Sequence, residues 1–85
     1  MPYIEQNRRE IFDPDIEHLL IGLSSIGELN YVITKLLIGY FPENSYQEYN
    51  AKVGLLECIK QEYYRRRVSV FEDAKCAERG DVYAP

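Results

Sequence analysis

Small and polar side chains at helical spacing in the second half of this sequence could line a binding site. Asn50, Gly54 and Glu57 follow one another at intervals of four and three residues, which places them on one stripe of a helix. A glycine inside a helix costs about 0.5–1 kcal/mol relative to alanine, so Gly54 predicts the close approach of a second helix. The polar side chains that the preceding helix could contribute there are Asn30, Tyr31 and Thr34.

This polar stripe has two interpretations. It could form a pocket for a small ligand, in which Glu57 would act as an acid or a base with a pKa tuned by burial. It could instead form a buried hydrogen-bond network that fixes the register between two helices. The network is the interpretation that we favour, and the ligand pocket stays an alternative.

A second candidate site consists of Tyr64 and the arginines that follow it, Arg65, Arg66 and Arg67. Aromatic rings stack on bases and arginines bind phosphates, so a nucleic-acid accessory protein is an alternative function. However, consecutive helical residues point about 100° apart and do not form one patch. The chain also carries 14 acidic against 10 basic residues, whereas nucleic-acid binders usually have a basic surplus. We therefore predict solvated or salt-bridged arginines, with Glu62 as one available partner.

Metal and nucleophilic chemistry have less support. His18 is the only histidine, and Glu57 and Glu62 are too far apart in sequence to chelate from one helical face. Cys58 and Cys76 have no imidazole placed beside them, and the chain has no glycine-rich phosphate loop. The sequence therefore predicts no catalytic residue, no metal site and no cofactor, and it favours a protein that is not an enzyme. The two cysteines are expected to be free and mostly buried.

Helix signals divide the first half of the chain into two helices. Asp13-Pro14 has the form of an N-cap followed by a first helical residue, and Gly27 is the expected left-handed cap at the end of that helix. The residues before Asp13 predict an extended lead and a helical turn or two. A second helix is expected over residues 28–41, where Pro42 ends it.

The second half of the chain predicts one long helix. Ser45 and Glu48 form a capping box at its start, and Gly80 is the expected end. Its continuity through residues 68–70 is left open, because two β-branched residues there lower helix propensity without forbidding a helix. Short connections favour antiparallel neighbours, so the predicted fold is all-α, a small antiparallel helical bundle in a single domain, residues 1–85.

The helix expected at 28–41 is apolar nearly all round. Tyr31, Ile38 and Phe41 fall beside or opposite its main apolar stripe. A lone chain of 85 residues has little interior to cover such a helix, and its eight tyrosines cannot all be buried cheaply. We therefore predict a non-enzymatic, self-associating module, a homodimer, with Tyr31, Ile38 and Phe41 at the interface.

The distribution of charge and hydrophobicity also bears on the compartment. The first ten residues are too polar for a signal peptide, and no apolar run approaches the length of a membrane span. The sequence therefore predicts a cytoplasmic protein without membrane contact.

Short segments spread along the chain carry a resemblance to a known family. They are Pro2-Tyr3-Ile4, Leu29-Asn30-Tyr31 with Ile33-Thr34, Gly54 through Glu57, Tyr64-Arg65-Arg66, Glu72-Asp73, and Gly80-Asp81-Val82-Tyr83. Together they resemble a family of short uncharacterised proteins, domains of unknown function, encoded in phage and prokaryotic genomes. The resemblance implies such a setting and no particular activity. Where that family has a proline before an aromatic-Glu-Asp segment, this chain has Ser69-Val70-Phe71, which favours an unbroken long helix.

Overall fold

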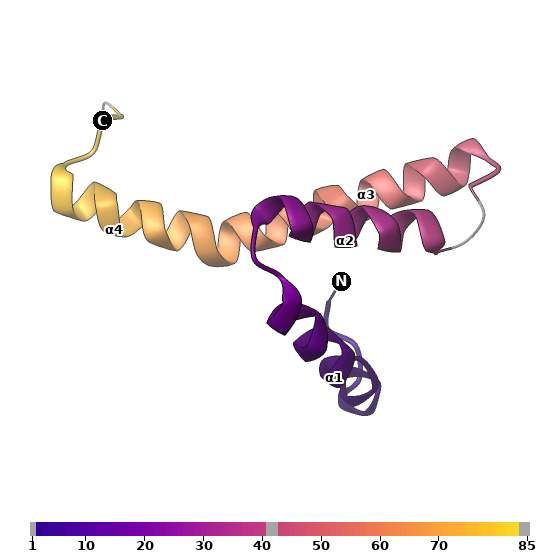
Figure 1. The fold of residues 1–85 in the computed structure, drawn as a ribbon. Helices are drawn as coiled ribbons and strands as arrows, with labels where there is room; N and C mark the ends of the chain where they lie inside the picture. The colour runs from indigo at the N-terminus through magenta and orange to yellow at the C-terminus, as the bar shows by residue number, and fades with distance from the viewer. Residues whose placement is uncertain (1, 41–42, 84–85) are drawn as a thin grey trace. The chain divides into compact units, whose positions relative to one another are not determined.

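A computed structural model describes residues 2–40 and 43–83, in which every regular element is a helix. In chain order these are α1 (Gln6–Gly22), α2 (Ile26–Gly39), α3 (Tyr46–Tyr63), a π-helical turn η1 (Tyr64–Val68) and α4 (Ser69–Arg79) (Figure 1). The last three follow one another without a break and form one C-terminal helix of 34 residues. The predicted all-α class is confirmed, and the described residues contain no strand.

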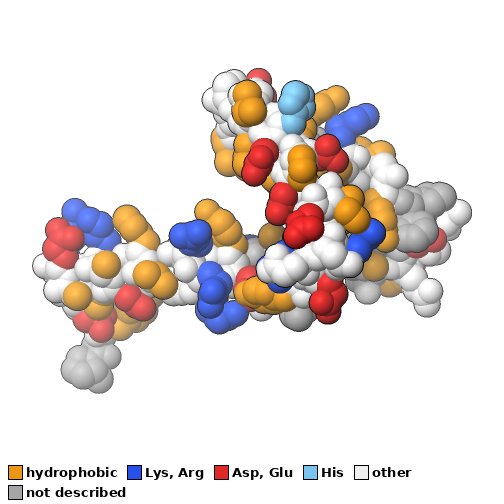
Figure 2. Space-filling model, turned by 90° about the horizontal axis from the view of Figure 1, so that it is seen from below, with side chains coloured by type: hydrophobic (Ala, Val, Ile, Leu, Met, Phe, Trp, Pro, Cys, Tyr) orange, Lys and Arg blue, Asp and Glu red, His pale blue; other side chains and the backbone are white. Residues whose placement is uncertain are grey.

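The chain divides into two units, Met1–Tyr49 and Asn50–Pro85. The first unit contains α1, α2 and the start of α3, and the second contains the remainder of the long helix. No described side chain is buried in either unit, and hydrophobic side chains lie at the surface of both (Figure 2). The single domain predicted from the sequence stays a prediction.

Helix α1 begins earlier than the sequence predicts. The predicted start at Asp13-Pro14 is wrong, because Pro14 lies inside the helix. The first turn forms upstream, where the carbonyl oxygen of Glu5 accepts bonds from the N–H groups of Arg8 and Arg9 at 3.0 and 3.1 Å. Pro14 removes one backbone hydrogen bond and crowds the carbonyl oxygen four residues earlier, yet α1 continues through it to Gly22.

The cap predicted at Gly27 is also wrong. Helix α1 ends at Gly22, and Leu23 is already extended. Gly27 lies in the first turn of α2 and does not have a positive φ. The hydroxyl of Ser25 caps α2 by accepting a bond from the N–H of Glu28 at 3.1 Å. This cap fixes the start of α2 at Ile26 and draws the glycine into the helix.

The end of α2 is only partly described. The helix ends at Gly39, and the N–H of Tyr40 still bonds to the carbonyl oxygen of Leu36 at 3.1 Å. Phe41 and Pro42, where the sequence predicts the end of the helix, lie outside the described residues.

The start of α3 is confirmed. The hydroxyl of Ser45 accepts a bond from the N–H of Glu48 at 3.3 Å. The Glu48 carboxylate in turn accepts one from the N–H of Asn44 at 2.8 Å. The hydroxyl of Tyr49 donates to the carbonyl oxygen of Glu43 at 2.8 Å, which ties the preceding loop to the first turn. Two side chains of the helix therefore hold the loop before it.

The long helix passes through residues 68–70 without a break, as the Ser69-Val70-Phe71 segment favours. A π-helical turn at η1 makes this possible, since the N–H of Ser69 bonds to the carbonyl oxygen of Tyr64, five residues earlier. Helix α4 ends where predicted, at Gly80, which has a φ of 96° and bonds to the carbonyl oxygen of Cys76 at 2.9 Å. Glycine adopts this φ without strain.

Candidate functional site

Helix α2 exposes apolar side chains on opposite faces. Tyr31 and Ile38 are two turns apart on one face, with 64% and 57% of their surface exposed. Ile33 and Leu36 lie on the opposite face, and 41% and 62% of their surface is exposed. Phe41, the third residue predicted for an interface, lies outside the described residues. A helix of this kind needs cover on two sides, and one neighbouring helix covers only one.

Two polar residues predicted for a ligand pocket lie together on α2. The hydroxyl of Thr34 lies 2.8 Å from the backbone carbonyl oxygen of Asn30 and 3.1 Å from its side-chain oxygen. These are bonds between residues one turn apart, so they satisfy the threonine hydroxyl within the helix itself. Tyr31 lies next to them in sequence and is exposed.

Glu57 on α3 is an exposed carboxylate with local partners. Its oxygens accept a bond from the amide of Gln61 at 3.1 Å and pair with the ammonium of Lys60 at 3.0 Å. The Gln61 amide, followed by Lys60, holds the pKa of Glu57 below its ordinary value. A general acid at neutral pH needs a shift in the other direction, so these contacts favour an ion-paired surface residue over a catalytic one.

The other two pocket residues, Asn50 and Gly54, share the stripe of Glu57 on α3. A Cβ atom built at Gly54 would meet no atom of the described residues within 4 Å. Helix α2 and this part of α3 belong to different units, so the pocket predicted between them stays a prediction.

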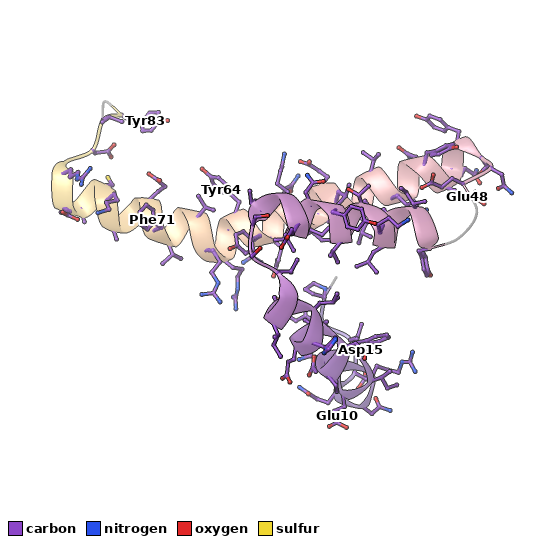
Figure 3. All side chains as sticks on the ribbon, viewed as in Figure 1. Glu10, Asp15, Glu48, Tyr64, Phe71 and Tyr83 are labelled. Carbon is purple, nitrogen blue, oxygen red and sulfur yellow. The ribbon has the colours of Figure 1, made fainter. Side chains whose placement is uncertain are left out.

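The arginine segment lies in η1. Arg65 pairs with Glu62 at 2.6 Å, which is one of the salt bridges that the sequence predicts. Arg66 and Arg67 are exposed, and neither side chain bonds to any residue in the described ranges 2–40 and 43–83. Tyr64, at the start of the turn, has 56% of its surface exposed and is labelled in Figure 3. The turn therefore holds two cations and an aromatic ring open to solvent.

An open hollow of about 370 Å³ lies where α1 ends and α2 begins. Its mostly apolar lining includes Leu19, Leu23, Tyr31 and Val32, with His18 and Glu28 at its polar positions. Leu23 and Val32 are among the few half-buried apolar residues of the chain. The helix end expected at Gly27 did not indicate this hollow, because α1 ends at Gly22 and α2 already begins at Ile26.

Metal-binding and thiol chemistry gain no support from the geometry. Within residues 2–40 and 43–83, no three histidine, cysteine, aspartate or glutamate side chains lie close enough to hold a metal ion. Cys58 and Cys76 are free, as predicted, but both are exposed. Their expected burial is wrong, because the helix that carries them has no buried residue.

The sequence of the chain matches one known protein family. The model of a family described as a domain of unknown function (DUF6899) matches residues 1–82. This chain belongs to the DUF6899 family. No curated protein and no solved structure matches it.

The matched range of the DUF6899 chain covers every described helix, from α1 to α4. No described helix of this DUF6899 chain is both long enough and apolar enough to span a bilayer. The family description names no activity, so the proposed function rests on the exposed surfaces of α2 and η1.

Proposed function

We propose that this DUF6899 chain is a non-enzymatic interaction module that associates with itself as a homodimer. The observation that carries the proposal is the exposure of apolar side chains on opposite faces of α2. A second copy of the chain can cover apolar side chains that α2 leaves exposed. Burial of apolar surface stabilises such a contact by about 25 cal/mol per Å².

A stable dimer requires a larger interface than the exposed side chains of α2 alone provide. A stable dimer buries about 800 Å² on each partner, which is more than a few side chains of one short helix supply. The contact therefore has to extend beyond Tyr31 and Ile38. The exposed apolar residues of α3 and α4 are available for that extension.

Sedimentation velocity over a hundredfold range of concentration tests the proposal. A dimer has twice the chain mass of 10.0 kDa. Its melting temperature rises with concentration, because association stabilises the folded state by mass action. A species with the mass of one chain at every concentration, and a melting temperature unchanged by dilution, would overturn the proposal.

A matched pair of variants locates the interface. Ile38→Lys places a charge on the exposed face of α2 and is expected to shift the equilibrium toward the monomer. Ile21→Lys makes the same change on α1, at a side chain that is 85% exposed, and is expected to leave the mass unchanged. Equal effects of the two variants would contradict an interface on α2.

Nucleic-acid binding through Tyr64, Arg65, Arg66 and Arg67 is a second candidate function. The open cations of η1 favour it, and the net charge of −4 weighs against it. Fluorescence anisotropy with a labelled single-stranded oligonucleotide at low salt tests it. Binding should be lost in Arg66→Glu and retained in the control Arg79→Glu, and no binding by the parent chain would reject this function.

We further propose a prokaryotic or phage setting and a cytoplasmic location. The support is the resemblance carried by the short segments along the chain, such as Leu29-Asn30-Tyr31. Fractionation of bacterial cells that express the chain tests the location. Recovery in the membrane or extracellular fraction would contradict it.

A further inference from the structure

The π-helical turn changes which residues share a face of the long helix. On a regular α-helix, the face that carries Leu56 and Tyr63 would next present Arg67, at the usual spacing of three to four residues. An i→i+5 turn contains one more residue than an α-helical turn. The next residue on that face is therefore Val68, followed by Phe71. The extra residue of η1 replaces a charge in the apolar line by a valine.

The resulting surface is the long-helix stripe, which consists of Val53, Leu56, Tyr63, Val68 and Phe71. It lies within one continuous helix of the second unit. Four of its members are exposed, with fractions of 64% for Val53, 38% for Leu56, 63% for Tyr63 and 59% for Phe71. Phe71 and the neighbouring Tyr64 are labelled in Figure 3. An apolar line of this length on a helix surface is typical of helix pairing.

We propose that the long-helix stripe pairs antiparallel with the same stripe of a second copy. This inference rests on the proposed self-association and names the surface of α3, η1 and α4 over which the contact extends beyond α2. Four of the five members of the stripe are related in pairs about residue 62, and Tyr63 falls level with Gln61 of the second copy. Val53 and Phe71 lie equally far from this midpoint, and so do Leu56 and Val68. Antiparallel pairing therefore sets Val53 level with Phe71 of the second copy, and Leu56 level with Val68.

The charges of the helix favour this direction over a parallel one. In a parallel pair, Arg65, Arg66 and Arg67 would lie level with the same arginines of the second copy, and like charges would repel. In the antiparallel pair, Arg67 lies level with Glu57 of the second copy. Lys52 likewise lies level with Glu72. These two pairs of opposite charges favour the antiparallel direction, and the one like-charged pair of this register is Glu62 with Glu62 of the second copy.

Spin labels attached to the two native cysteines report the direction of helix pairing. Both thiols are exposed and accept a nitroxide spin label. The variants Cys58→Ser and Cys76→Ser leave one label on each copy, and double electron–electron resonance gives the distance between copies. About residue 62, labels on Cys76 are separated along the axis by 28 residues, or about 42 Å. Labels on Cys58 are separated by eight residues, or about 12 Å.

Each outcome bears on the inference in a different way. A long distance for Cys76 with a short one for Cys58 supports antiparallel pairing. Short distances at both sites overturn it in favour of a parallel pair. A dimeric mass without either pattern overturns the pairing and leaves the proposed self-association standing. A monomeric mass overturns both.

A matched pair of leucines tests the stripe itself. Leu56→Asn places an amide in the middle of the paired surface and is expected to weaken dimerisation about tenfold or more. The control Leu55→Asn makes the same change one residue away, where the side chain is 48% exposed and points to another face. Circular dichroism of both variants shows whether the helix itself is retained. Equal dissociation constants for the two helical variants would overturn the role of the stripe.

Discussion

The N–H and the hydroxyl of Ser69 both bond to the carbonyl oxygen of Tyr64, with the hydroxyl at 3.1 Å. The same hydroxyl lies 2.8 Å from the carbonyl oxygen of Arg65. A serine hydroxyl that bonds back to the preceding turn competes with the regular helical pattern and alters it locally. We therefore expect the π-helical turn, and with it the register of the long-helix stripe, to depend on this one side chain.

Removal of this hydroxyl should destabilise η1. In Ser69→Ala, the two carbonyl oxygens lose their side-chain donor, and we expect the free energy of unfolding to fall by about 0.5–1 kcal/mol. Urea denaturation measures the loss, and the backbone chemical shifts of residues 64–69 report on the turn. Ser69→Thr keeps a hydroxyl and serves as the control. Unchanged shifts in the alanine variant would show that the backbone alone maintains the turn.

The start of α2 should depend on pH through Glu28. The N–H of Ser24 and then its hydroxyl donate to the Glu28 carboxylate, at 2.7 and 2.9 Å, and hold its pKa below the ordinary value of 4.5. Since the folded pKa is the lower one, the stabilisation is complete above about pH 4.5. It is lost as the pH falls through the folded pKa.

Nuclear magnetic resonance checks this dependence. The amide of Ser24 should shift in a titration from about pH 6 to about pH 3, with a midpoint below the value expected for a free glutamate. Glu28→Gln removes the titrating group and should abolish that step. A midpoint at or above the ordinary value would contradict the bonds from Ser24.

Local capping signals predicted part of this fold, because a cap needs only neighbouring residues. Ser45 and Glu48 meet across a single turn, and Gly80 ends α4 with its own φ. At Asp13-Pro14 the same logic failed, because the helix already begins at Gln6 and continues through Pro14 despite the lost bond and the crowding that a proline causes. The cap predicted at Gly27 was wrong because Ser25 caps the next helix, so that Gly27 lies inside α2.

The candidate sites were predictable only in part for a related reason. The exposure of Tyr31 and Ile38 follows from the apolar pattern of α2, which the sequence displays directly. The extra residue of η1 does not follow from the apolar pattern. The Ser69 hydroxyl bonds back to the preceding turn there, but serine occurs in regular helices as well. With α-helical spacing throughout, Leu56 and Val68 would not share a face, so the sequence pattern alone does not predict the stripe that joins them.

The cap at Gly80 should not tolerate a side chain. Gly80→Ala forces a residue with a Cβ atom into a φ of 96°, and we expect a loss of about 1 kcal/mol in the free energy of unfolding. Thermal denaturation measures it. Gly39→Ala is the matched control, because that glycine ends α2 without a positive φ and has open space around it. A neutral effect at Gly80 would mean that its positive φ is not maintained in solution.

Alanine at Gly54 distinguishes an open helix surface from a close helix contact. Within the described residues nothing lies within 4 Å of a Cβ atom at this position, so Gly54→Ala should stabilise α3 by about 0.5–1 kcal/mol through helix propensity alone. If a second helix packs against this glycine, as the sequence predicts, the added methyl group clashes and stability falls instead. Urea denaturation gives the sign. Repeating it across a range of concentrations distinguishes a contact within one chain from one between copies, since only the second loses its effect on dilution.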